Sequence, residues 1–137
     1  MLRDRLGYLL KHAQLAVTER TTAVLAPLGI NGRELAVLTV LREDAGPALA
    51  QQQAAGKLNV DRTTMVDLVD VLEGKGLVER RPDPADRRRN LVHLTTKGEQ
   101  TRKKGERLYR ETEQALLSET EMADLKRLLQ KLSEPDD

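Results

Sequence analysis

The sequence contains no cysteine, no phenylalanine and no tryptophan, and it has only two tyrosines. Without cysteine, the chain has no disulfide, no thiolate metal site, no cysteine nucleophile and no thiol redox sensor. The near absence of aromatic rings excludes the stacking platforms on which single-strand binding proteins hold bases. The hydrophobic core must therefore be built from aliphatic side chains.

Long hydrophobic runs are also missing. No stretch reaches the length of a membrane span, and residues 1–5 lack the apolar segment of a signal peptide. The 137 residues are 39% hydrophobic and 33% charged, a balance typical of soluble folded chains. We expect one domain, residues 1–137, without internal repeats, located in the cytoplasm and with no membrane partner.

Charge is nearly balanced overall, but it is unevenly distributed. The net charge is +1, whereas residues 75–107 alone carry 11 basic and 5 acidic residues. A basic block in an otherwise neutral protein is typical of a surface that meets a polyanion. A solvated charged surface is the alternative interpretation, and charge alone does not decide between them.

The spacing of apolar residues predicts a mostly helical chain. The breaks at proline and glycine, together with residues suited to cap a helix, divide it into six expected helices: 2–26, 31–44, 51–58, 60–73, 96–117 and 118–132. Capping boxes are predicted at Asn31 with Glu34, at Thr96 with Glu99, and at Ser118 with its Glu three residues on. Asn59 is predicted to cap the helix that starts at residue 60.

Between the fourth and fifth helices the apolar period changes from that of a helix to that of a strand. Residues 77–81 and 90–94 are predicted to form a β-hairpin with a long, charged tip at 82–89. Three helices followed by such a hairpin form a winged helix-turn-helix. The expected fold is therefore mainly α with a small β-wing.

This arrangement predicts double-stranded DNA as a partner. Short polar side chains at the start of the third helix suit the major groove, and arginines of the wing suit the electronegative minor groove. Two glutamines at the start of the preceding helix can contact phosphates. The candidate DNA-binding residues are Gln51, Gln52, Asp61, Arg62, Thr63, Thr64, Asp67, Arg87, Arg88 and Arg89.

Two motifs in this region resemble the MarR family of transcription regulators. These are L-E-x-K-G-L-V-x-R over residues 72–80 and D-x-R followed by L-T-x-x-G over residues 86–98. The resemblance implies a homodimer that binds a pseudo-palindromic operator, as a repressor or less often an activator. It also implies a DNA-binding lobe over 31–95, with dimerisation helices at 1–28 and 96–134. Arg88 takes the place of the arginine that enters the minor groove, and Asp86 the place of the acid that orients it.

The chain departs from the family pattern at two positions. Relatives commonly carry a basic or small polar residue where this chain has Asp67. A carboxylate facing DNA is repelled by phosphate unless it accepts a hydrogen bond from cytosine or pairs with a protein arginine. Asp70, by contrast, fits the pattern and is expected to form internal ion pairs. Ala50 stands where relatives often have a capping Ser or Thr.

The family resemblance also implies a cleft for a small phenolic or aromatic effector. Tyr8 and His12 lie one turn apart on the first helix and are candidates to line it, although an interface tyrosine and a surface histidine are an equally simple interpretation. No metal-binding or catalytic motif is recognisable, so we expect neither a cofactor nor an enzyme. A winged helix that binds only protein remains the alternative, favoured by Asp67 and opposed by the wing arginines.

Overall fold

The computed structural model describes residues 1–42 and 49–134. A single turn of 3-10 helix, Leu2–Asp4, precedes α1 (Leu6–Leu25), and a second, Ala26–Leu28, leads to α2 (Gly32–Val40). The chain continues through β1 (Leu49–Ala50), α3 (Gln51–Leu58), α4 (Arg62–Gly74), β2 (Val78–Asp83) and β3 (Asp86–Leu94). It ends with α5 (Thr96–Leu116) and α6 (Glu119–Ser133).

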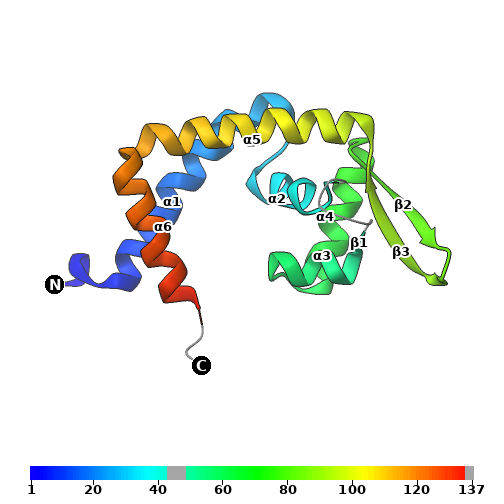
Figure 1. The fold of residues 1–137 in the computed structure, drawn as a ribbon, viewed down its shortest axis with the longest axis horizontal. Helices are drawn as coiled ribbons and strands as arrows, with labels where there is room; N and C mark the ends of the chain where they lie inside the picture. The colour runs from blue at the N-terminus through cyan, green and yellow to red at the C-terminus, as the bar shows by residue number, and fades with distance from the viewer. Residues whose placement is uncertain (43–48, 135–137) are drawn as a thin grey trace.

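Helix α5 spans the molecule and joins its two parts (Figure 1). At one end, α1 and α6 lie below α5, near both chain termini. At the other end lie α2, α3, α4 and the β-hairpin. The molecule therefore has two separate ends joined by α5, and the division into a DNA-binding lobe and dimerisation helices stays a prediction.

The core lies mainly where α2, α4 and the sheet meet the start of α5. Its fully buried members are aliphatic, as the composition requires: Leu25, Val37, Leu38, Met65, Val69, Leu72 and Val92. Gly105 lets α5 approach this core closely, since a Cβ atom there would lie 2.8 Å from Cδ1 of Leu35. The core thereby fixes α5 to the lobe that carries α4.

The wing differs from its prediction. Strands β2 and β3 pair in antiparallel register from Val78 opposite Leu94 to Pro82 opposite Asn90. The register then shifts, Asp83 lies opposite Asp86, and two residues form the turn. The predicted tip of eight residues is wrong, and Arg87, Arg88 and Arg89 lie within β3. Strand order is β1-β3-β2, which leaves β2 at an edge. Pro82 is tolerated in the ladder there because an edge strand has free N–H positions.

Two of the predicted caps are confirmed and two are wrong. Capping boxes form at Asn31 and at Ser118. Thr95 rather than Thr96 caps α5, its hydroxyl accepting from the amide of Gly98. The cap of α4 is Asp61 rather than Asn59.

The sequence predicted which segments are helical better than it predicted where each helix begins and ends. The first helix is interrupted at Arg5, whose ψ of 135° is extended. Helix α2 ends at Val40, and residues 43–44 of the predicted helix lie outside the described residues.

Among the described residues, no single helix is long and apolar enough to cross a membrane. Residues 6–28 and 32–40 are long and apolar enough for a membrane span only when they are counted together, and a bend of 71° separates them.

Candidate nucleic-acid interface

The turn between α3 and α4 sets where the exposed face of α4 begins. Asn59 adopts a left-handed conformation, with φ of 54°, which asparagine tolerates better than most residues. Asp61 then caps α4, its Oδ1 accepting from the amide of Thr64 at 2.6 Å. This hydrogen bond lowers the pKa of the Asp61 carboxyl below its ordinary value. Asp61, predicted to face bases, is thus engaged in starting the helix.

A groove of about 410 Å³ lies between α3, α4 and β3. Five of the predicted DNA-binding residues line it together: Gln51, Gln52, Arg62, Arg88 and Arg89. Three cationic side chains and two amides from three separate elements therefore converge on one concave surface. Asp61 and Thr63 line a shallower neighbouring depression that shares Gln52 and Arg62 with the groove. Thr64, Asp67 and Arg87 line neither, although Asp67 and Arg87 are exposed.

Asp86 contacts Arg88, the wing arginine that the family resemblance singles out. Oδ1 of Asp86 accepts from the backbone amide of Arg88 at 3.1 Å and lies 3.6 Å from Nε of the same residue. The Arg88 side chain is nonetheless 95% exposed. Asp86 therefore fixes the backbone of Arg88, and the exposed guanidinium can contact another molecule; that Asp86 orients this guanidinium stays a prediction.

Arg80 joins the root of the wing to both helices of the motif, a role that was not predicted from the sequence. Its guanidinium pairs with Asp70 at 2.7 Å and Glu73 at 3.1 Å on α4. Its Nε also donates to Oε1 of Gln51 at the start of α3, at 2.8 Å. The expected internal ion pair of Asp70 is confirmed. The one sequence signal that pointed to Arg80 is its position as the last residue of the motif over residues 72–80.

Asp67 differs from Asp70 in having no partner of this kind. It is exposed on α4, and no hydrogen bond or ion pair to its side chain is found within residues 1–42 and 49–134. Pairing with a protein arginine, one of the two interpretations left open by the sequence, is therefore not seen in the protein alone.

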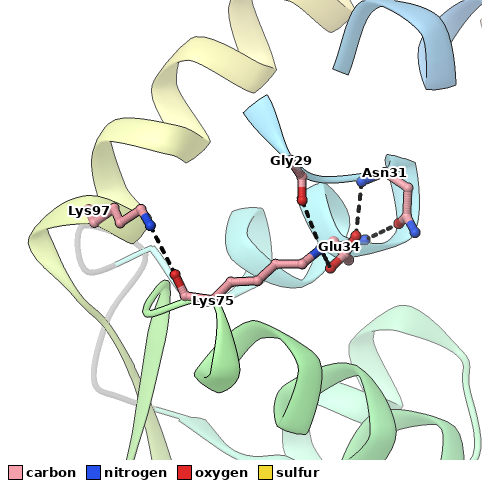
Figure 2. A network of polar contacts seen from close by, with 5 residues as sticks. All are labelled: Gly29, Asn31, Glu34, Lys75 and Lys97. Carbon is pink, nitrogen blue, oxygen red and sulfur yellow. Dashed lines mark hydrogen bonds and ion pairs between the residues drawn. The ribbon is translucent and has the colours of Figure 1, made fainter. Parts of the chain in front are cut away.

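A second polar network fixes the far end of α4 (Figure 2). Nζ of Lys75 lies 2.6 Å from Oε2 of the buried Glu34 and 2.7 Å from the carbonyl oxygen of Gly29. Glu34 also completes the capping box with Asn31, and Lys97 donates to the carbonyl oxygen of Lys75. The start of α2, the end of α4 and the start of α5 are thus joined. Nothing in the sequence pattern indicated this network.

The two candidate effector-binding residues lie far from the groove, on α1. The rings of Tyr8 and His12 contact each other, with centroids 4.0 Å apart. An apolar cavity of about 540 Å³ lies elsewhere, between α2 and α5, and is lined in part by Leu35, Leu58 and Tyr109. Neither Tyr8 nor His12 belongs to its lining, so their role stays a prediction.

Comparison with known proteins places the chain among regulators of this architecture. A model of the MarR family matches residues 28–89. A putative transcriptional regulatory protein for the hcr operon of Thauera aromatica is 35% identical over 135 residues, which cover 96% of this chain and 77% of that protein. The HTH-type transcriptional repressor NicR of Pseudomonas putida is 31% identical over 99 residues, which cover 69% and 59% respectively.

Solved structures agree along the whole chain. The transcriptional repressor CouR bound to a 23-mer DNA duplex superposes with a TM-score of 0.89 at 33% identity, covering 97% of this chain and 95% of that one. CouR from Rhodococcus jostii RHA1 bound to p-coumaroyl-CoA gives a TM-score of 0.83 at 28% identity, covering 100% and 97%. The predicted winged helix-turn-helix and the family resemblance are confirmed.

Proposed function

Because the chain belongs to the MarR family of transcription regulators, we propose that it is a repressor that binds a pseudo-palindromic operator as a homodimer. The observation that carries this proposal is the groove in which Gln51, Arg62 and Arg88 converge from α3, α4 and the wing. Helix α4 enters the major groove, Arg88 enters the adjacent minor groove, and the glutamines contact phosphates. The similarity to a repressor bound to a DNA duplex supports this arrangement.

The homodimer is supported by apolar side chains that this chain leaves in solvent. Large aliphatic residues are more than one third exposed on both terminal helices: Leu6, Leu9, Leu10 and Leu15 on α1, and Leu125, Leu128, Leu129 and Leu132 on α6. An apolar surface of this extent is unusual on a monomer. A second copy that presents the same helices would cover it and would set two copies of α4 side by side for two operator half-sites.

Release from DNA by a small aromatic effector is the regulatory part of the proposal. The apolar cavity between α2 and α5 has the size of a small-molecule site and lies at the junction of the two ends of the molecule. A ligand that binds there would favour one spacing of the two α4 helices over another and so change operator affinity. CouR bound to p-coumaroyl-CoA supports an aromatic acyl compound as the class to test. Repression of this kind requires no catalysis. We place the protein in the cytoplasm, together with the operator DNA that it would bind.

Selection of bound duplexes from a random pool, followed by titration of the best sequence by fluorescence anisotropy, tests the DNA-binding proposal. The expected outcome is an inverted repeat whose half-sites lie about one helical turn apart, bound much more tightly than random duplex at the same salt. Failure to enrich any sequence, with binding equal to that of random DNA, would overturn it and would favour a winged helix that binds only protein.

A further inference from the structure

The groove between α3, α4 and β3 leaves one apolar side chain exposed among polar ones. Of the described residues that line it, Met65 and Val66 alone are apolar, and Met65 is fully buried. Val66 is 38% exposed and is not part of the buried core. A single exposed valine is ordinary on a protein surface, so its place among the predicted DNA-binding residues is the informative feature.

The local structure holds Val66 in this place. It lies one turn after Arg62, so both side chains are on the same face of α4 and line the same groove. Its carbonyl oxygen accepts a hydrogen bond from Nη2 of Arg80 at 3.3 Å, which ties this turn of α4 to the wing. A β-branched side chain in a helix also has one strongly preferred χ1 rotamer. Val66 can therefore contact a ligand in the groove with little loss of conformational entropy.

A second exposed valine on the same helix provides an internal comparison. Val71 is 48% exposed, yet it lines neither the groove nor the neighbouring depression. The two valines are five residues apart, which places them about 140° apart around the helix axis. Val66 and Val71 thus share residue type, helix and exposure, and they differ in whether they face the groove.

The bases differ in what they present to an apolar side chain. In the major groove thymine presents a methyl group, whereas guanine, adenine and cytosine present hydrogen-bond donors and acceptors. A valine placed against a donor or acceptor leaves that group without a partner, which is costly once water is excluded. A valine placed against a methyl group buries apolar surface on both sides.

We propose that Val66 reads a thymine in each operator half-site by contact with its 5-methyl group. This rests on the proposed operator binding by α4 and adds the identity of one base to it. Arg62 and the wing arginines attract the duplex through its charge, and Val66 selects among sequences without any hydrogen bond.

The test replaces thymine by deoxyuridine, which differs only in lacking the methyl group. Each thymine of the selected operator is replaced in turn, at the equivalent place in both half-sites, and full-length protein is titrated by fluorescence anisotropy at fixed salt. We expect one position at which the replacement weakens binding by about 4-fold for each half-site, the effect of burying one methyl group. In Val66→Ala the same replacement should change affinity less than about 2-fold, because the shorter side chain no longer reaches the methyl group.

Val71→Ala is the matched control and should keep the deoxyuridine sensitivity of the wild type. Circular dichroism checks that both variants are folded. If the wild type enriches no sequence from a random pool, operator binding fails and this inference fails with it. If it enriches an inverted repeat whose thymines all tolerate deoxyuridine, the role of Val66 alone is overturned. Sensitivity that persists in Val66→Ala also overturns it, since another group, such as the methyl of Thr63, would then contact the thymine.

Discussion

At the scale of the residue, Arg88 offers the most direct test of the wing. Its side chain is 95% exposed while Asp86 holds its backbone and its Nε. We predict that Arg88→Ala weakens operator binding by about 1–3 kcal/mol and leaves the fold intact, because the guanidinium contacts no core residue. Arg81→Ala is the control, since Arg81 lies on the other strand and pairs with Glu79. Anisotropy titration at moderate salt measures both. An unchanged affinity in Arg88→Ala would show that the wing does not contact DNA.

Asp67 supplies a prediction of opposite sign. An exposed, unpaired carboxylate on α4 repels phosphate, so Asp67→Asn should tighten binding to random duplex. If the carboxylate also accepts from a cytosine amino group, the gain on the selected operator should be smaller or absent. Equal tightening on both DNAs would show that Asp67 repels without reading a base. Weaker binding to random duplex would show that it does not face DNA.

Gly98 tests the junction between the wing and α5. A Cβ atom at this position would lie 1.9 Å from the carbonyl oxygen of Leu77, and a backbone atom cannot move aside as a flexible side chain can. We predict that Gly98→Ala lowers the free energy of unfolding by about 3 kcal/mol or more, because a substitution that overpacks a rigid site this severely forces the backbone to shift. Gly56→Ala is the control, because a Cβ atom there meets open space. Chemical denaturation followed by circular dichroism compares the two, and equal stability would contradict the close approach.

At the scale of the element, local signals were predictable and long-range ones were not. The capping boxes at Asn31 and Ser118 involve residues three apart, and sequence spacing reveals them. The cap was assigned to Asn59 wrongly because asparagine is common both at helix caps and in left-handed turns. The conformation of the turn that leads into α4 determines which of these two roles Asn59 has. The extent of the wing depended on Pro82 lying in an edge strand, and strand order is a property of the whole sheet. The pairing of β1 with β3 likewise joins segments about forty residues apart, beyond any local pattern.

Arg80 determines how these elements are set against one another. It bonds α3 through Gln51 and α4 through Asp70 and Glu73, from its position on β2. We predict that Arg80→Met weakens operator binding by about 10-fold or more, because hydrogen bonds to charged groups contribute about 1.5–3 kcal/mol and their loss frees the wing from α4. The apparent contribution of Arg88 should also fall in this background, which a double-mutant cycle with Arg88→Ala measures. Full additivity of the two variants would contradict a positioning role for Arg80.

At the scale of the whole molecule, α5 connects two functions that occupy opposite ends. One end is held rigid by the core and by the network of Glu34 with Lys75, while the other exposes its leucines. The sequence predicted this organisation through the family resemblance and the apolar stripes of the terminal helices. It did not locate the cavities, because they are formed by side chains of α2, α3, α5 and α6 that meet only after folding.

Dimerisation is the prediction that belongs to this scale. Leu128 and Leu132 on α6 are 53% and 56% exposed, one turn apart on the same helix face. In a homodimer they are buried, so Leu128→Glu should bring an unpaired charge into an apolar interface and oppose assembly. Because folding of such a chain is linked to association, the unfolding midpoint of the wild type should rise with protein concentration. In the variant that dependence should vanish, with monomer or aggregate appearing in sedimentation velocity and operator affinity lost. Val71→Glu, at an exposed valine on α4 in the other lobe, is the matched control and should remain a dimer. A wild type that sediments as a folded monomer at micromolar concentration would refute the assembly, and with it the pairing of two α4 helices on one operator.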